Sequence, residues 1–444
     1  SYYLASVADS VYLNPSGSFL FNGLSSQTSF LTDALKNIGV EMQVLKVGKF
    51  KGATETFTEK QLSENNRHQT EVFINSIYNN YLKNVAASRK LTVENLKSLA
   101  DNLTINLAKD AVEHKLVDKL AYIDEVRNTI KSNLGLKADD KINFIGINKA
   151  YKSNLVKRKY NKDKIAIVYA SGEIGSGKGN ENNIGSETLT KALREARTND
   201  KIKAIVLRVN SPGGSSLASD VIYREVQLCS KAKPVIVSMG DLAASGGYYI
   251  SAGADSIVAQ PTTITGSIGV FMLLPNMQKL LNEKIGINYE TVNSATHADI
   301  GRVDRALTSD ERQYFQNMVN NIYNDFISIV ADGRNMSKEM VDSIGQGRVW
   351  TAKDAQGIGL VDVIGSLDDA IKIAAYKADI KEYSIKSLPK MKSPSERILQ
   401  NLNGIESSYL KSKLGKNYLY FEQLERIQRL EGTQMLLPYD IKID

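Results

Sequence analysis

The sequence contains two copies of one pattern, and this repeat limits the possible folds more than any other feature. Residues 2–11 read Tyr-Tyr-Leu-Ala-Ser-Val-Ala-Asp-Ser-Val, and residues 248–257 read Tyr-Tyr-Ile-Ser-Ala-Gly-Ala-Asp-Ser-Ile. Further blocks match in the same order at almost the same separation, namely 77–80 with 322–325, 85–89 with 330–334, 108–111 with 352–355 and 116–118 with 360–362. Shared helical composition alone does not keep blocks in register in this way, so we interpret the chain as a tandem repeat.

The first copy is shorter than the second at its N-terminal side. A stretch from about residue 164 to residue 247 precedes the Tyr-Tyr pair of the second copy, and its counterpart would lie before residue 1. We therefore predict four parts, which are an N-terminally truncated first repeat (1–148), a basic linker (149–163), a second repeat (164–380) and a helical C-terminal tail (381–444). A solvated linker is the preferred reading of the basic stretch, and contact with anionic lipid headgroups is the alternative.

The second copy alternates short apolar strands with amphipathic helices. Strands are predicted over 164–170, 204–209 and 234–238, and helices over 186–196 and about 217–230. Strands separated by helices of this length favour an α/β fold with largely parallel pairing. After residue 390 the pattern becomes helical and charged, and it ends in an extended-looking apolar segment at 436–439, which we hypothesise docks in a neighbouring groove.

The composition excludes several kinds of site. A net charge of +7 on 444 residues is too mild to indicate a nucleic-acid-binding protein. Cys229 is the single cysteine, which excludes an internal disulfide and a multi-cysteine metal site, and it is predicted to be a small core residue. His68, His114 and His297 lack the spacing of a zinc site. No apolar stretch reaches 18 residues, so we predict no membrane-spanning segment in this chain.

Two glycine-rich turns follow consecutive predicted strands. The first is Asn210-Ser-Pro-Gly-Gly-Ser215, and the second, Ala243-Ala-Ser-Gly-Gly-Tyr248, places Ser245 among small residues where a strand gives way to a helix. Small neighbours let a substrate backbone approach the hydroxyl, and nearby backbone N–H groups can stabilise an oxyanion. A phosphate cradle is the rival reading, but neither turn has a phosphate-binding spacing.

A nucleophilic serine needs a base, and no histidine lies in a comparable turn. A buried lysine without a carboxylate partner can take this role when its pKa falls from about 10.4 toward roughly 7–8. The chain has 56 Lys and Arg residues, so composition and spacing give no unique candidate for the base.

The two turns and a third motif, Thr265-Gly-Ser-Ile-Gly269, together resemble the signal peptide peptidase A family, also called protease IV. Members are serine peptidases with a ClpP/crotonase-like fold, and the tandem arrangement is similar to the long Gram-negative form. The resemblance covers residues 1 to about 380. It implies an α/β fold of two ClpP/crotonase-like repeats, the first truncated at its N-terminus, followed by the C-terminal tail.

The family uses a Ser/Lys dyad, and in its long form the second repeat supplies the serine and the first the lysine. The resemblance implies Ser245 as nucleophile and Lys51 as general base, because residues 48–53 read Gly-Lys-Phe-Lys-Gly-Ala. Lys49 is the alternative, more simply explained as a solvated side chain. The corresponding place in the second copy, near residues 296–298, has no lysine. One dyad per chain is therefore expected.

Further roles follow from the same resemblance. The backbone N–H groups of Gly214 and Gly246 resemble the oxyanion hole. Ser267 matches a position that hydrogen-bonds and orients the lysine, although a turn serine that satisfies backbone groups is an equal reading. His297 is expected at the surface, with a place in the site as the less favoured alternative.

The implied function is hydrolysis of cleaved signal peptides in or at the membrane, by acyl transfer and without a metal or organic cofactor. The family also implies an N-terminal anchor that this chain does not contain, a catalytic part in the periplasm at the inner membrane, and a homo-oligomer, commonly a tetramer. No nucleic-acid partner is expected.

Two rival functions remain at this stage. A crotonase-like acyl-CoA enzyme would use the same turns to hold a thioester enolate without needing Ser245 or Lys51. A non-catalytic oligomeric scaffold would keep the repeats and lack hydrolysis. The lysine segment argues against both.

Overall fold

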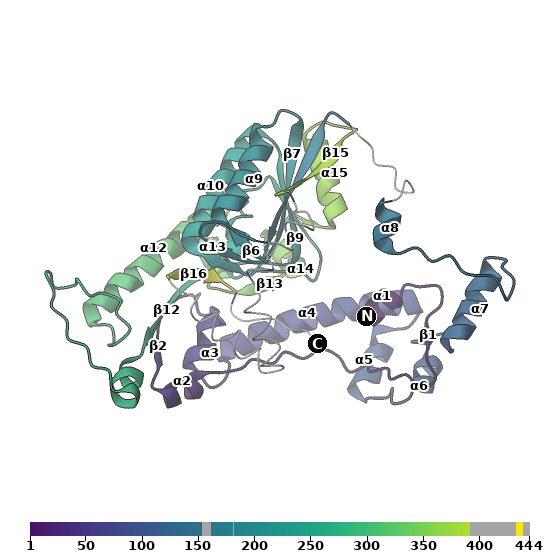
Figure 1. Ribbon diagram of the computed structural model, residues 1–444, viewed down its shortest axis with the longest axis horizontal. Helices are drawn as coiled ribbons and strands as arrows, with labels where there is room; N and C mark the ends of the chain where they lie inside the picture. Colours follow the sequence, from purple (N-terminus) through teal and green to yellow (C-terminus); the bar gives the residue numbers. More distant parts are fainter. Residues whose placement is uncertain (153–160, 181, 391–431, 438–444) are drawn as a thin grey trace. The chain divides into compact units, whose positions relative to one another are not determined.

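The computed structural model describes residues 1–152, 161–180, 182–390 and 432–437 (Figure 1). The described chain forms two compact units, a smaller one with residues 1–26 and 72–152 and a larger one with residues 27–71 and 161–437. Residues 27–71 therefore pack in the same unit as the second copy. The repeat limits that we read from the sequence remain a prediction.

The larger unit is built on a mostly parallel sheet of eight strands (Figure 1). Three long strands form its centre, β4 (Lys164–Ser171), β7 (Ile202–Ser211) and β9 (Val235–Ala244), and they pair in parallel. The remaining strands are β10 (Ser256–Ala259), β11 (Ile264–Gly266), β13 (Val349–Thr351), β14 (Val363–Ile364) and β15 (Ser384–Leu388). The predicted strands at 164–170, 204–209 and 234–238 are confirmed.

Both faces of this sheet are buried, which explains why its strands read as continuous apolar runs rather than as alternating ones. Alternate residues of one strand enter different cores. In β4, Ala166 and Val168 join the core that includes helices α9 (Ser186–Thr198) and α10 (Ser216–Ala232). Ile165 and Ile167 join the core that includes Ala370 and Ala374 of helix α15 (Leu367–Lys377). The α/β fold class is thereby confirmed.

A second sheet of six strands has the order β2–β12–β16–β8–β5–β6. Its strands are β2 (Glu41–Val47), β12 (Val270–Asn276), β16 (Thr433–Leu436), β8 (Gly213–Ser215), β5 (Glu173–Gly175) and β6 (Asn183–Gly185). The first copy thus supplies one strand of a sheet whose other members come from the second copy and from the C-terminal tail. Shorter helical elements join the strands. They are α2 (Thr32–Ile38), a 3-10 turn (Gly52–Thr54), α3 (Glu55–Thr58), α11 (Gly246–Tyr249), a π-helical turn (Leu280–Ile285), α13 (Lys338–Ile344) and α14 (Ala352–Gly357).

The smaller unit packs helices around a two-stranded parallel sheet. Its elements are α1 (Tyr2–Ala5), β1 (Tyr12–Leu13), α5 (Val93–Asp101), α6 (Ala108–Glu113), β3 (Lys119–Leu120), α7 (Ile123–Asn133) and α8 (Ile147–Lys152), together with most of α4 (Glu64–Arg89). Leu82, Val85 and Leu96 are fully buried in its core. Thr92 caps α5 by accepting a hydrogen bond from the N–H group of Asn95.

The repeat is visible in matching structural details of the two copies. Helix α4 and helix α12 (Ser309–Arg334) are each 26 residues long. The parallel pairing of β1 with β3 corresponds to that of β10 with β14. The ion pair of Arg89 with Asp118 corresponds to that of Arg334 with Asp362. Two copies of one fold therefore account for the periodic blocks in the sequence.

Parts of the linker and tail predictions lie outside the described residues. This applies to most of residues 149–163 and to the helical pattern at 420–430. The described parts of residues 381–444 include strands β15 and β16, so this region contributes to both sheets. Across the described residues, the structure contains no helix that is both long and apolar enough to span a bilayer.

Candidate active site

Ser245 lies at the end of strand β9 in a strained backbone conformation. Its φ is 55° and its ψ is −116°, a combination that non-glycine residues rarely adopt and that tends to occur at functional sites. The Ser245 N–H group donates a hydrogen bond of 2.8 Å to the Gly266 carbonyl, which ties the turn to β11. The side chain is fully buried. The sharp turn after β9 therefore fixes the direction of the hydroxyl.

Close packing explains the small residues after Ser245. A Cβ atom at Gly247 would lie 2.7 Å from the Ser211 carbonyl oxygen, and one at Gly246 would lie 2.6 Å from Ser219 Oγ. Larger side chains at these positions would push the turn away from strand β7 and helix α10. The Ser-Gly-Gly sequence thus allows the turn to pack at this depth.

Strand β2 carries the lysine segment to the same place. It pairs antiparallel with β12 over seven residues, from Val47 opposite Val270 to Glu41 opposite Asn276. Residues that follow β2 are thereby placed beside those that precede β12. Lys51 follows the first of these strands, and Ser267 precedes the second.

The three side chains meet inside the larger unit. Lys51 Nζ lies 2.8 Å from Ser245 Oγ, 3.0 Å from Ser267 Oγ and 3.1 Å from the Ser267 carbonyl oxygen. None of the three residues has measurable solvent exposure. The residues expected as nucleophile, base and lysine-orienting group are therefore neighbours in the structure.

The surroundings of Lys51 favour a neutral amine. Burial lowers its pKa well below the usual lysine value, because removal from water penalises the charged form. Among the residues that the structure describes, no carboxylate contributes to its pKa shift. A neutral lysine in contact with a serine hydroxyl is able to accept a proton from it.

Ser267 is held in place by the backbone of a later segment at Arg348. Its φ of 51° lies in the left-handed region. Its N–H group donates a hydrogen bond of 2.7 Å to the Arg348 carbonyl. Its own carbonyl and hydroxyl oxygen atoms accept hydrogen bonds from Lys51 Nζ.

The glycine turn of β8 lies beside Ser245. Gly214 has a φ of 150°, and a Cβ atom there would lie only 2.1 Å from the Ile174 carbonyl oxygen. A Cβ atom at Gly213 would lie 2.7 Å from the backbone nitrogen of Gly246. The two backbone segments expected to form the oxyanion hole are thus adjacent.

Strand β16 of the tail also reaches this place, which sequence reasoning missed. Met435 pairs with Gly214 in antiparallel register, and Leu437 N–H donates a 2.7 Å hydrogen bond to the Pro212 carbonyl. The Met435 carbonyl oxygen is 1.9 Å from the position of a Cβ atom at Gly213. A backbone carbonyl of an extended segment therefore occupies the space next to the glycine turn. Residues 438 and 439 of the segment that we expected to dock lie outside the described residues.

Other residues singled out in the sequence lie elsewhere. Lys49 is exposed, with its Nζ 5.5 Å from the centre of the Phe50 ring. His297 is exposed. Cys229 is buried against the Leu193 carbonyl, and burial raises the pKa of its thiol to about 12.

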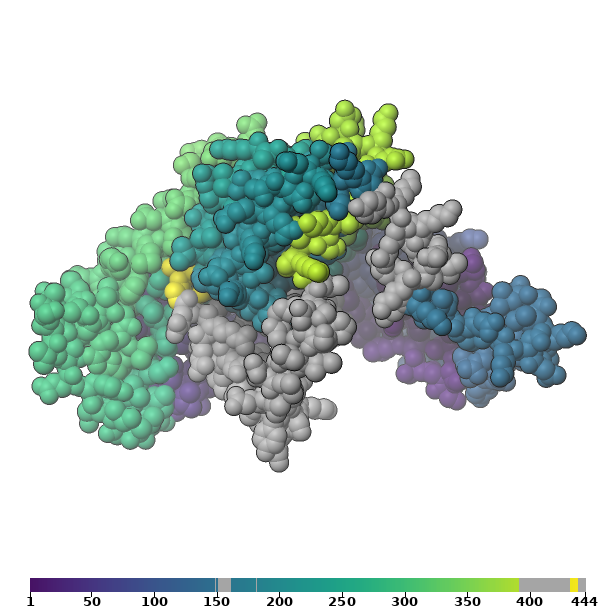
Figure 2. All heavy atoms as spheres, turned by 45° about the horizontal axis from the view of Figure 1, so that its top comes forward, coloured from purple at the N-terminus to yellow at the C-terminus, as the bar shows by residue number. Residues whose placement is uncertain are grey.

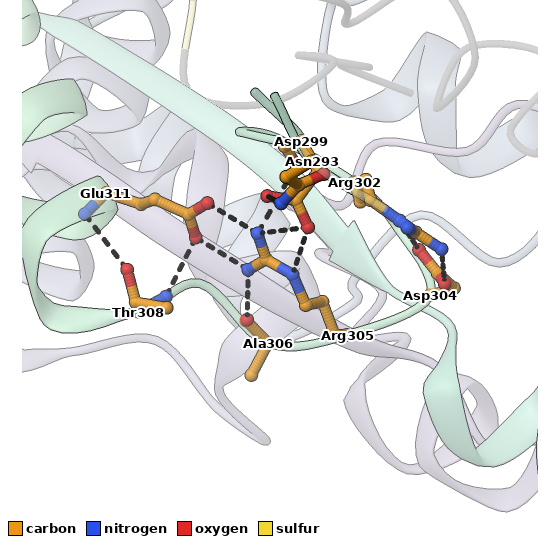
Figure 3. A network of polar contacts seen from close by, with 8 residues as sticks. All are labelled: Asn293, Asp299, Arg302, Asp304, Arg305, Ala306, Thr308 and Glu311. Atoms are coloured by element: carbon orange, nitrogen blue, oxygen red, sulfur yellow. Dashed lines mark hydrogen bonds and ion pairs between the residues drawn. The ribbon is translucent and has the colours of Figure 1, made fainter. Parts of the chain in front are cut away.

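The second-copy counterpart of the lysine segment has a different character. Residues 282–298 are exposed throughout and lie on the surface in Figure 2. The residues that follow them form an ionic network (Figure 3), in which Arg305 binds both Asp299 and Glu311, while Arg302 pairs with Asp304. No lysine approaches a serine in this segment.

Comparison with known proteins agrees with the internal repeat. The model of peptidase family S49 matches residues 1–137 and 227–381, and the Clp protease model matches residues 157–264. The ClpP-like, tandem character of the predicted fold is confirmed.

Curated relatives match over most of the chain. The chain is 36% identical to the chloroplastic serine protease SPPA of Arabidopsis thaliana, over 92% of this chain and 61% of that protein. It is 38% identical to protease 4 of Salmonella typhi over 86% of this chain and 63% of that protein. It is 35% identical to protease 4 of Haemophilus influenzae, over 84% of this chain and 62% of that protein. The chain thus spans less than two thirds of the length of these relatives.

Solved structures show more distant similarity. A mutant of ClpP1 from Listeria monocytogenes has 16% identity and a TM-score of 0.32, and the match covers 46% of this chain and 94% of that chain. A mutant of the membrane-bound stomatin-specific protease 1510-N has 16% identity and a TM-score of 0.34, and the match covers 52% of this chain and 100% of that chain.

The family model matches both copies, and the resemblance that the motifs indicated is confirmed at this level. The chain belongs to peptidase family S49.

Proposed function

We propose that this chain is the catalytic part of a serine endopeptidase that uses Ser245 as nucleophile and Lys51 as general base. The observation that carries the proposal is the 2.8 Å contact of Lys51 Nζ with Ser245 Oγ, in a fully buried setting where no carboxylate of the described part of the chain acts on the lysine. Membership of family S49 supports the same reaction class.

The partners of the amine suit both of its protonation states. Neutral lysine has two N–H bonds, which donate to the Ser267 hydroxyl and carbonyl oxygens, and one lone pair, which accepts the Ser245 O–H group. In the ammonium state, all three N–H bonds find the same three oxygen atoms. The amine can therefore gain and lose a proton without leaving a buried polar group unpaired.

The reaction begins when Ser245 Oγ attacks the carbonyl carbon of a peptide bond while its proton moves to Lys51. The N–H groups of Gly214 and Gly246 stabilise the resulting oxyanion. The C–N bond then breaks, the Lys51 ammonium gives its proton to the leaving amine, and the acyl group stays on Ser245. Water attacks the ester, Lys51 takes its proton, and this proton returns to Ser245 Oγ as the acid leaves.

An extended peptide backbone fits beside the site. Strand β16 already lies antiparallel to β8, with the Met435 carbonyl close to Gly213 and Gly214. We propose that a substrate takes the place of β16 along β8 in the same extended manner, so that its scissile carbonyl approaches Gly214 and Gly246. Cleaved signal peptides, which are apolar and lack a fixed fold, are the proposed natural substrates.

The wider setting is part of the same proposal. The full-length protein is proposed to be a homotetramer, anchored in the inner membrane with its catalytic part in the periplasm. Size-exclusion chromatography with light scattering checks the oligomer, and fractionation of cells that express the full-length protein checks the location. A monomer or a cytoplasmic protein would contradict these two statements separately.

Hydrolysis of an apolar fluorogenic peptide tests the dyad. Ser245→Ala and Lys51→Ala should each lose activity while keeping the melting temperature of a folded protein. Ser251→Ala and Lys49→Ala are matched controls, since Ser251 is also fully buried and Lys49 lies in the same segment. Cleavage that survives Ser245→Ala or Lys51→Ala would refute the proposed site. Binding of coenzyme A together with that survival would favour the acyl-CoA reading.

A further inference from the structure

The lysine segment is held by a side chain from the start of helix α4. Gln69 Nε2 donates a 3.1 Å hydrogen bond to the Phe50 carbonyl, which belongs to the peptide bond that joins Phe50 to Lys51. Gln69 Oε1 accepts a 3.0 Å hydrogen bond from the Val349 N–H group at the start of β13. One buried amide therefore links the lysine backbone to the sheet of the second copy.

A second hydrogen bond holds the same backbone segment. The Phe50 N–H group donates a 2.9 Å hydrogen bond to the Gln346 carbonyl. The packing around it is tight, because a Cβ atom at Gly347 would lie 2.7 Å from the Lys51 backbone nitrogen. The backbone before Lys51 is thus fixed on both of its polar groups, which limits where Nζ can reach.

The orientation of the Gln69 amide follows from its neighbours. The Glu55 carboxylate, which can only accept, takes hydrogen bonds from Asn66 Nδ2 at 2.5 Å and from Ser63 Oγ at 2.7 Å. This turns Asn66 Oδ1 toward Gln69, where it accepts from Nε2. Gln69 must then present its Nε2 to Phe50 and its Oε1 to Val349.

The hydrogen-bonded residues Glu55, Asn66 and Gln69 are all buried, and the only charged group among them, the Glu55 carboxylate, is not in contact with the lysine. Glu55 is 4% exposed, Asn66 is 0% exposed and Gln69 is 1% exposed. The Glu55 carboxylate is satisfied by Ser63 and Asn66, and it makes no contribution to the pKa shift of Lys51. Two neutral amides separate the carboxylate from the lysine segment.

We propose that Gln69 is a positioning residue that holds Lys51 against Ser245 and keeps the segment closed to water. This inference rests on the proposed Ser/Lys function and deepens it. Gln69 does not touch the reacting atoms. It acts through the Phe50–Lys51 peptide, and a glutamine suits this place because it provides one donor and one acceptor without charge.

The experiment compares peptide hydrolysis by the full chain and by three variants across a pH series. Gln69→Met removes both hydrogen bonds at similar size, and Gln69→Glu removes the donor and adds a negative charge near the amine. Gln43→Leu is the matched control, since Gln43 is also buried and accepts a backbone hydrogen bond, from Leu307 at 2.8 Å. Melting temperatures are measured for all proteins.

Gln69→Met should lower kcat at least about tenfold with KM changed less than about threefold, because the lysine no longer rests in contact with the nucleophile. The pH profile of its activity should move to higher pH, because water that enters around Lys51 raises the lysine pKa toward its usual value. Gln69→Glu should move the profile further, by about one pH unit or more, if it folds. Gln43→Leu should lower the melting temperature without moving the profile.

A folded Gln69→Met variant with the wild-type kcat and profile would overturn the inference. The same holds if Gln43→Leu moves the profile as much as Gln69→Met, because the effect would then be general loosening. Failure of the dyad itself is distinct, since it would appear as activity that survives Ser245→Ala or Lys51→Ala.

Discussion

The lysine segment and its second-copy counterpart lie at corresponding positions of the predicted repeat, but their charged side chains have opposite surroundings. Around Lys51 the segment is buried, its partners are neutral, and burial lowers the lysine pKa. In the counterpart, residues 282–298 are exposed and the following arginines are paired with carboxylates (Figure 3). Pairing with Arg305 lowers the pKa of Glu311 to about 2.

The difference shows how the surroundings of a charged side chain set its pKa. An ion pair stabilises the charged form of both partners, so it moves pKa values away from neutrality and leaves the groups chemically inert. Burial beside neutral oxygen atoms instead makes the charged form costly. The first copy thus has a buried amine with a lowered pKa, while the second has an ionic network.

The largest effect is expected when Lys51 is removed, and a second substitution asks whether a lysine in the second-copy counterpart can replace it. Lys51→Ala should lower kcat by at least about a thousandfold, because the serine loses its base. Adding Ala298→Lys in the same protein should not restore hydrolysis, since residue 298 is exposed and a lysine there keeps its charge. Steady-state kinetics of the single and double variants measure both effects. Recovery of activity in the double variant would contradict the contrast between the two segments.

A second prediction concerns pH. Because the lysine must be neutral to accept the proton, activity should rise with pH and reach an alkaline plateau, with a midpoint below the usual lysine pKa of about 10.4. A flat profile from about pH 6 to 10 would be inconsistent with a lysine base.

The same pKa shift has a consequence for stability. The unfolded chain binds a proton at Lys51 up to about pH 10.4, whereas the folded chain releases it at lower pH, so the lysine lowers stability as pH falls through this window. Lys51→Met should therefore stabilise the protein at pH 7, by on the order of 1–3 kcal/mol, and the gain should vanish above about pH 10.4. Thermal unfolding at both pH values measures it. A gain of equal size at the two pH values would point to packing rather than to charge.

A fourth prediction concerns the ionic network. Arg305→Gln should destabilise the protein by on the order of 3 kcal/mol at pH 7, because Glu311, which is 2% exposed, loses its cation. The folded pKa of Glu311 is depressed, so the contribution of the pair is present above about pH 4.5 and is lost as pH falls toward 2. Chemical denaturation at pH 7 and pH 3 gives the difference, and the activity profile near neutrality should stay unchanged. A shifted profile would mean that the two segments are coupled.

The smallest effect is expected for His297. Because its side chain is exposed, His297→Ala should change neither the rate of hydrolysis nor its pH dependence beyond experimental error. The pH series used for Lys51 serves as the measurement. A change in the rate or in its pH dependence would show that this histidine takes part in the reaction.

Much of the fold could be predicted because its signals are local or repeated. Strands β4, β7 and β9 are continuous apolar runs, and the turn at Ser245 is marked by small residues in adjacent positions. Lys51 has no such signal, since it is one of 56 basic residues, and only the motif Gly-Lys-Phe-Lys-Gly-Ala singled it out.

Other features depend on long-range contacts that leave no periodic trace. Gln69 and Asn66 are polar residues in a helix, and nothing in their spacing predicts that both are buried or that Gln69 binds the Phe50 carbonyl. The pairing of Met435 with Gly214 joins residues that are more than 200 positions apart. Such contacts are decided by the assembled sheet and not by the segment itself.

The seven-residue pairing of β2 with β12 has a consequence for the timing of activity. It is the step that brings Lys51 to Ser245, although the two residues are 194 positions apart in the chain. During synthesis Lys51 leaves the ribosome long before Ser245, so the proposed dyad cannot form until the second copy has been made. Under the proposed mechanism, hydrolysis therefore begins only after β2 has paired with β12.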